Sequence, residues 1–212
     1  MAVLYLRQHV IPIDYLTTIA VLLLASLLFV LTFAERRRRG VNLHFFALGA
    51  GFLLLETKSI TTISLYFGAT WFVSMIVILG VLIMVLAANI VAGRLKGFTP
   101  AFYAPLAASI LFLYFFPTEL VLAWSFPLRL LFSLAVIPLP IFFAGLIFSS
   151  SFRDSADTSF AFGSNLLGAM VGGFVEYLGM ITGTQALLLI VLIFYLISFW
   201  AQWRSAQSPA AA

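Results

Sequence analysis

The sequence has 212 residues, of which 64% are hydrophobic and only 8% are charged. A water-soluble domain carries roughly 25% charged residues, so this composition excludes a soluble globular protein and predicts a surface that faces mostly lipid. The net charge of +4 does not indicate nucleic-acid binding, because four of the eleven basic residues form one run, Arg36–Arg39, directly after an apolar segment, which is a signal of membrane topology.

Seven apolar segments follow one another along the chain, each close to the ~20 residues that cross a bilayer as a helix. The backbone in hydrocarbon must satisfy its own hydrogen bonds, and the apolar runs are continuous rather than alternating, so helices are expected rather than a barrel. The predicted fold is an all-α, polytopic transmembrane bundle in which residues 1–212 form a single domain with short loops. The predicted spans are 13–34, 43–66, 70–93, 100–116, 128–150, 159–180 and 184–203.

The fifth predicted span, 128–150, contains Pro138 and Pro140 in the segment "VIPLPIFF". Each proline removes a helical hydrogen bond and favours a kink. Two interpretations remain open at this point: a kink that only serves packing, or a hinge or broken helix that lines a cavity.

The placement of Lys and Arg predicts the orientation of the bundle. If the end of the first span lies inside, eight basic residues lie inside and two lie outside, with Lys58 within a span. The N-terminus is therefore expected outside and the C-terminus inside. The inside set is Arg36, Arg37, Arg38, Arg39, Arg94, Lys96, Arg153 and Arg204, and the outside set is Arg7 and Arg129.

The segment "GFLLLETKSITTISLYFG" places Glu56 and Lys58 in the middle of the second span. A charge at that depth costs about 2.5–3.5 kcal/mol on insertion scales, so such residues usually face the bundle or a cavity and have a partner. Residues two apart on a helix do not face each other, so these two are not expected to pair. Either the helix breaks at "ETKS" or each charge has a partner elsewhere.

The sixth span offers such a partner, because polar and small residues recur there on one helix face. Gly168 and Gly172 form a GxxxG pattern that allows another helix to approach closely. Both the second and sixth spans run outward, so we expect an ion pair between Lys58 and Glu176. The residues that share the face are Asn165, Gly168, Gly172 and Glu176.

Asn89, late in the third span, lies at the same depth as Asn165, and the two are expected to share a polar layer. Gly49, Gly51 and Gly173 are further expected positions of helix packing. Three roles stay open for the intramembrane polar groups: structural pairing, a path for a solute or protons, or an interface position if the span is misplaced.

No catalytic or metal-binding set is predicted. The chain has no cysteine, and its two histidines, His9 and His44, are not spaced as a ligand pair. The "FGSNLLGAMVGG" segment follows no strand and lacks a Walker lysine, so it does not indicate a nucleotide loop. We expect no cofactor, no metal and no nucleic-acid partner.

The segments "FFALGAGFLLLETKSITTISLYFGATWFVSMIVILGVLIMVLAANI", "PLPIFFAGLIFSSSF" and "FGSNLLGAMVGGFVEYLGMITGTQALLLIVLIFYL" occur in this order between residues 43 and 196. Together they resemble the membrane region of the integral-membrane spermidine/spermine synthase-like proteins of bacteria, whose members carry similar "GFxLLE" and "NLLGAxxGGxxEY" motifs. The resemblance implies a multi-pass protein of the bacterial inner membrane.

Members of that family generally join the membrane helices to a Rossmann-like aminopropyltransferase domain. That domain needs a glycine-rich loop after a strand, which this sequence lacks, so the resemblance implies the membrane half alone and transfers no catalytic residue. Three functions are compatible with this. The chain is a non-catalytic domain that anchors or partners a soluble aminopropyltransferase-like enzyme, a permease-like carrier of a small polar or cationic solute that would need a homodimer or a missing half, or a structural subunit among other membrane subunits.

Overall fold

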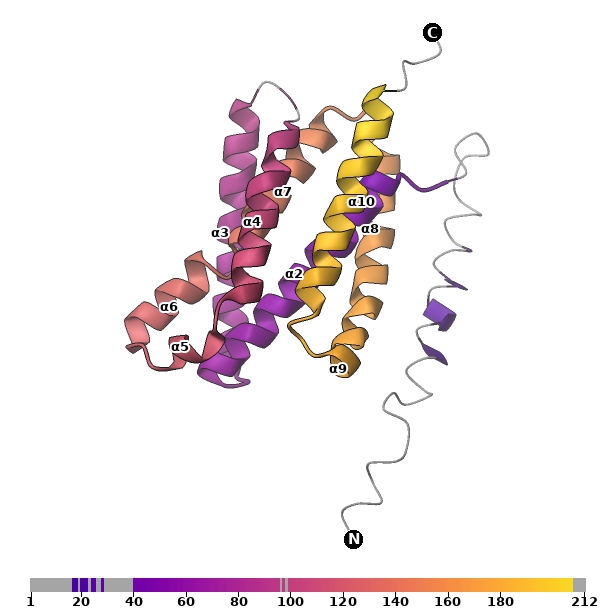
Figure 1. The fold of residues 1–212 in the computed structure, drawn as a ribbon. Helices are drawn as coiled ribbons and strands as arrows, with labels where there is room; N and C mark the ends of the chain where they lie inside the picture. Colours follow the sequence, from indigo (N-terminus) through magenta and orange to yellow (C-terminus); the bar gives the residue numbers. More distant parts are fainter. Residues whose placement is uncertain are drawn as a thin grey trace. The chain divides into compact units, whose positions relative to one another are not determined.

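The computed structural model describes residues 40–95, 97 and 99–207, together with scattered positions between residues 17 and 28. The chain divides into two compact units, Met1–Val41 and Asn42–Ala212, and the second is the unit described below. The described residues are helical or lie in turns, without a β-strand. The helices are α2 Leu43–Phe67, α3 Trp71–Arg94, η3 Pro100–Phe102, α4 Tyr103–Phe115, α5 Thr118–Leu122, α6 Phe126–Ala135, α7 Leu139–Arg153, α8 Thr158–Val175, η4 Glu176–Leu178, α9 Gly179–Thr182 and α10 Leu187–Gln207 (Figure 1).

Five of the described helical segments are long and apolar enough to cross a membrane, which confirms a multi-pass helical protein but corrects the predicted number of seven spans. They are Leu43–Phe67, Trp71–Arg94, Phe126–Arg153, Thr158–Leu178 and Leu187–Ser205. The predicted span 13–34 lies mostly outside the described residues. Which end of the bundle faces the cytoplasm stays a prediction.

The predicted fourth span, 100–116, is the one that falls short within the described residues. Its helix runs only from Pro100 to Phe115. At about 1.5 Å per residue it spans about 24 Å, less than the ~30 Å of a typical hydrocarbon core. Proline explains both limits, because Pro100 starts the helix and Pro117 follows directly after its C-cap, Phe116.

Helix α2 is the element around which the others are arranged. It crosses the bundle obliquely, with α3, α4 and α7 towards one side and α8 and α10 towards the other (Figure 1). It packs against α8, α10, α3 and α7, while α4 contacts both α7 and α10. The side chain of Asn42 caps its first turn by accepting hydrogen bonds from the backbone N–H groups of His44 and Phe45, at 3.1 and 3.3 Å.

Glycine brings α2 and α8 into backbone contact. A Cβ atom added to Gly168 would overlap the carbonyl oxygen of Phe46, and one added to Gly49 would overlap the carbonyl oxygen of Asn165. At Gly172 the added atom would lie 2.5 Å from the carbonyl oxygen of Ala50. These positions therefore need glycine for close approach, as small-xxx-small contacts between membrane helices do.

The other two glycines predicted at helix contacts face side chains. A Cβ atom at Gly51 would lie 2.9 Å from the ring of Tyr195 in α10, and one at Gly173 would lie 3.1 Å from Leu53. Gly51 therefore marks the face of α2 that meets α10, whereas Gly49 marks the face that meets α8. This division decides where the charged residues further along α2 point.

The outer surface of the described bundle is apolar. Helix α3 alone exposes Trp71, Met75, Ile78, Leu79, Leu82, Ile83, Leu86 and Ile90 by 48–76%. Contiguous exposure of this size is unfavourable in water, so the surface fits contact with lipid.

The fifth predicted span is a broken helix and not a smoothly kinked one. Helix α6 ends at Ala135, a turn covers residues 136–138, and α7 begins at Leu139. Pro138 and Pro140 have no N–H to continue the α6 ladder, whereas both suit the first turn of a new helix. The prolines therefore separate two helices within one apolar segment.

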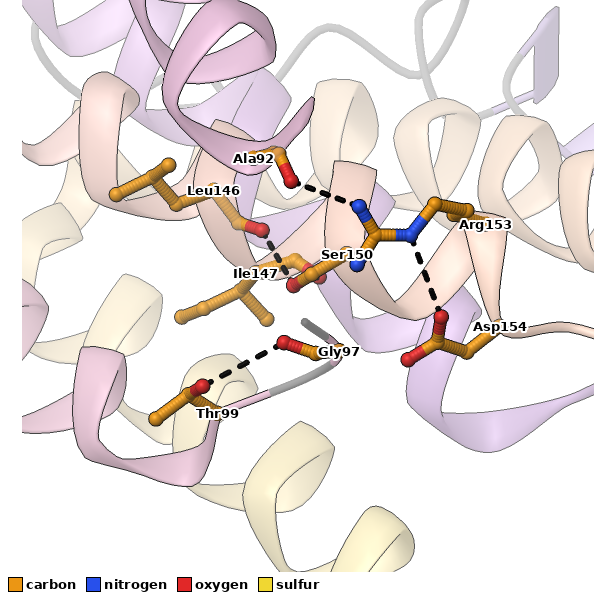
Figure 2. Close-up of polar contacts among 8 residues, drawn as sticks. All are labelled: Ala92, Gly97, Thr99, Leu146, Ile147, Ser150, Arg153 and Asp154. Atoms are coloured by element: carbon orange, nitrogen blue, oxygen red, sulfur yellow. Dashed lines mark hydrogen bonds and ion pairs between the residues drawn. The ribbon is translucent and has the colours of Figure 1, made fainter. Parts of the chain in front are cut away.

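Arg153 links the end of α7 to the end of α3 (Figure 2). The Arg153 Nη1 atom donates a hydrogen bond of 2.7 Å to the carbonyl oxygen of Ala92 in the last turn of α3, and its Nε atom lies 3.4 Å from Asp154 Oδ1. A cation here satisfies a helix C-terminal carbonyl and complements the helix dipole. The end of α7 is thereby tied to the end of α3.

Substitution of Gly168 tests the contact between α2 and α8. We expect Gly168→Ala to destabilise the folded bundle by about 1–3 kcal/mol, because the added methyl group overlaps a backbone carbonyl that cannot move independently. The measurement is the free energy of unfolding in detergent micelles.

Gly163 in the same helix is the matched control, since a Cβ atom there meets nothing within 4 Å. We expect Gly163→Ala to be neutral or to stabilise by up to about 1 kcal/mol through helix propensity. Equal effects of the two substitutions would contradict the close approach.

Candidate functional site

Lys58 lies on the face of α2 that meets α10. Lys58 follows Gly51 by seven residues, which corresponds to a rotation of about 700° around the helix axis, about 20° short of two full turns. Lys58 and Gly51 therefore lie on the same face of α2. Its side chain is buried, with 7% exposed, and its Nζ atom donates a 3.3 Å hydrogen bond to Thr184 Oγ1, just before α10. The predicted ion pair with Glu176 is not formed within the described bundle.

Glu176 is nevertheless connected to this position. Together with Thr61 and Thr184 it lines a hollow of about 250 Å³, which we call the Glu176 hollow. Thr184, whose hydroxyl group Lys58 contacts, therefore lines the same space as Glu176. The predicted Lys58–Glu176 pair was therefore wrong about the direct contact, although both residues lie near Thr184. The Lys58 side of α2 is covered by α10 and not by α8.

A second hollow lies on the other side of Lys58, and we call it the Lys58 hollow. It measures about 20 Å³ and is bordered by α2, α4, α5, α6, Ile137 in the turn between α6 and α7, and the start of α10. Its space corresponds to about one water molecule. The break at Pro138 thus borders a cavity, as one of the two interpretations of the proline pair proposed. Its polar lining residues are Lys58, Ser59, Thr62, Tyr66, Thr118 and Gln185.

Glu56 lies on the α8 side of the same helix, since it follows Gly49 by seven residues. Its side chain is half-buried. Among the described residues it has neither a hydrogen bond nor an ion pair. Helix α2 is unbroken at "ETKS", so Glu56 and Lys58 point to different neighbours, as residues two apart on a helix must.

Asn89 and Asn165 come together, but they do not form one hydrogen-bonded layer. Both line a groove of about 250 Å³ between α2, α3, α7 and α8, which we call the asparagine groove. Ser149 Oγ donates to Asn89 Oδ1, whereas Asn165 Nδ2 donates to the carbonyl oxygen of Phe45 at 3.2 Å. Each amide is thus held by a different neighbour on the wall of a shared space.

A buried network that was not predicted joins α2, α4 and α10. The Ser198 hydroxyl lies 2.9 Å from His44 Nδ1 and 2.8 Å from the Tyr103 hydroxyl, and Ser198 is fully buried. A serine beside a histidine suggests nucleophilic chemistry, but this one is enclosed by three helices. No local sequence pattern connects residues 44, 103 and 198, so only the fold reveals the group.

Arg129, which was predicted only to lie outside, has a structural role that the sequence did not indicate. Its guanidinium group donates to the carbonyl oxygens of Tyr66, Leu122 and Trp124, at 3.1, 3.1 and 3.0 Å. These carbonyls lie at the C-terminal ends of α2 and α5, where no helical donor remains. Arg129 therefore holds the α5–α6 segment against the end of α2.

Comparison with protein-family models, with curated proteins and with solved structures found no match to this chain. The resemblance to the spermidine synthase-like membrane proteins thus remains an expectation from the quoted motifs. Within the described residues, no three His, Asp or Glu side chains are grouped so as to hold a metal ion.

A double-mutant cycle tests the contact of Lys58. We expect Lys58→Met and Thr184→Val to couple by about 0.5–1.5 kcal/mol in the free energy of unfolding, because either change alone removes the same hydrogen bond. The cycle is measured by unfolding in detergent micelles.

Thr182 supplies the control, because its hydroxyl donates locally to the carbonyl oxygen of Leu178 at 2.9 Å and is exposed. Lys58→Met and Thr182→Val should add within about 0.5 kcal/mol. Additivity of Lys58→Met with Thr184→Val would show that the lysine has another partner.

Proposed function

We propose that this chain is a non-catalytic domain of a multi-pass membrane protein that holds a partner polypeptide through the Glu56 side of α2. Because Glu56 lies at mid-membrane depth, the partner contacts it through a membrane-spanning segment. The motifs that resemble the spermidine synthase-like family suggest that this segment belongs to a protein with a soluble aminopropyltransferase-like domain, at the inner membrane of a bacterium. A second copy of the chain or another membrane subunit would use the same surface.

One observation carries the proposal. Glu56 lies in the middle of a membrane-length helix, is only half-buried, and has no partner among the described residues. A carboxylate at such a depth is costly and is usually paired. The predicted first span, 13–34, contains no lysine, arginine or histidine, so it brings no cation of its own to that depth. A basic or hydrogen-bonding group from another polypeptide is then the natural partner.

The interior of the described bundle favours a structural role over the binding of a solute. The helices α2 and α8 meet through glycine, so their contact leaves no room for a solute. Many intramembrane hydroxyls are bonded to helical carbonyl groups, among them Ser59, Ser109, Ser133 and Ser150. Such hydroxyls are satisfied locally and leave few groups to receive a substrate.

A permease-like function is the second candidate, and the asparagine groove favours it. This groove carries Asn89, Ser149 and Asn165 on otherwise apolar walls, and Phe52 on its border lies one helical turn before Glu56. The alternative requires that Glu56→Gln abolish uptake of a polar solute, for which radiolabelled spermidine is the first probe. Uptake that survives Glu56→Gln removes this candidate.

Site-directed photo-crosslinking tests the partner proposal in native membranes. A benzophenone amino acid at Ile60, one turn after Glu56 on the same face and 40% exposed, should give a discrete protein adduct on irradiation. Its mass distinguishes a polypeptide that carries a soluble enzyme domain from a second copy of the chain or another membrane subunit. Glu56→Gln should weaken the adduct severalfold, because it removes the charge that holds the partner.

Leu79 provides the matched control position, since it is 51% exposed on α3 and lies on the lipid-facing surface. The same amino acid at Leu79 should give no protein adduct. If Ile60 gives no adduct either, or an adduct that is indifferent to Glu56→Gln, the proposal is wrong.

A further inference from the structure

The Lys58 hollow places a basic side chain beside a space without an acidic one. Six polar residues line it, and none of them is Asp or Glu. Lys58 is 7% exposed, and its one described hydrogen bond goes to the neutral Thr184 hydroxyl. An ammonium group removed from water requires a compensating charge or several acceptors, and the described residues supply one hydroxyl.

Tyr66 adds a second unsatisfied donor to the same space. Its side chain is 5% exposed, and the hydroxyl group has no hydrogen-bond partner among the described residues. A buried phenolic hydroxyl usually finds a partner, because leaving it unpaired costs about 1–3 kcal/mol. It borders the Lys58 hollow together with the hydroxyl-bearing residues Thr62 and Thr118.

Carbonyl groups near these donors already accept hydrogen bonds from other side chains. Gln185 Nε2 donates to the carbonyl oxygens of Leu113 and Tyr114 at the end of α4, at 3.2 and 2.7 Å. Arg129 similarly occupies the carbonyl oxygen of Tyr66. The lining therefore combines a buried ammonium group with an unpaired phenolic donor and contains no acidic residue, and donors of this kind bind anions.

We propose that the Lys58 hollow binds a small monovalent anion of the size of chloride, held by the Lys58 ammonium group and the Tyr66 hydroxyl. The volume of about 20 Å³ limits the ligand to an atom-sized species and excludes phosphate esters and larger carboxylates. Anion binding at this position would join α2 to α4, α6 and α10 and stabilise the bundle. Two carboxylates are competing negative charges. Glu176 lines the neighbouring Glu176 hollow with Thr184, and Glu119 at the start of α5 acts electrostatically on Tyr66.

The first measurement is the melting temperature of the purified full chain in detergent, with sodium chloride replaced stepwise by sodium gluconate at constant ionic strength. Gluconate is too large for the hollow. We expect chloride to raise the melting temperature with the logarithm of its concentration above the dissociation constant, by about 3–6 °C at tenfold excess. Broadening of the chloride NMR signal measures the binding directly and should saturate in the same range.

Two variants and one control assign the effect to the hollow. Lys58→Met removes the charge at similar length and should abolish the chloride dependence, and Tyr66→Phe should weaken the affinity severalfold. Arg204→Gln removes an exposed cation that lies over Trp200 and should retain the full effect. If Lys58→Met does not fold, Tyr66→Phe carries the test.

The proposal is overturned if chloride and gluconate give the same melting curve for the unmodified chain. It is also overturned if Tyr66→Phe leaves the affinity for chloride unchanged, or if the chloride effect persists in a folded Lys58→Met, since the anion would then bind elsewhere. The crosslinking at Ile60 reports on the opposite side of α2, so either proposal can fail without the other.

Discussion

The contact of α2 with α8 is the constraint on which the described bundle depends. In lipid, helices do not associate to escape water, so their association rests on tight packing and on hydrogen bonds. Gly49 and Gly168 allow the two backbones to touch. Two polar links reinforce the contact, from Asn165 Nδ2 to the carbonyl oxygen of Phe45 and from the Asn42 backbone N–H to Ser164 Oγ.

This contact determines the direction of every other face of α2. Once Gly49 faces α8, Gly51 must face elsewhere, and it meets Tyr195 of α10. Residues seven apart lie on nearly the same face of a helix, so Glu56 lies on the face of Gly49 and Lys58 lies on the face of Gly51. The positions of both charges thus follow from glycines that carry no functional group.

The class of fold could be predicted because apolar length is a local property, and five long helices are found where spans were expected. The helix Pro100–Phe115 has nearly the predicted bounds, and the prediction was wrong in counting so short an apolar run as a membrane span. The Lys58–Glu176 pair required knowing which helix covers which face, and periodicity within one helix does not contain that information. The same holds for the group of His44, Tyr103 and Ser198, which three distant segments supply.

The distribution of satisfied and unsatisfied polar groups connects structure to function. In a bilayer each unpaired polar group is costly, and the described bundle pairs many of its hydroxyls with nearby carbonyl groups. Glu56, Lys58 and Tyr66 are among the polar groups that the described residues leave partly or wholly without partners. Because Glu56 and Lys58 are two residues apart, one partner cannot serve both. A polypeptide beside α8 and a small anion beside α10 would satisfy them independently, and α2 would then couple an external contact to an internal one through a single rigid helix.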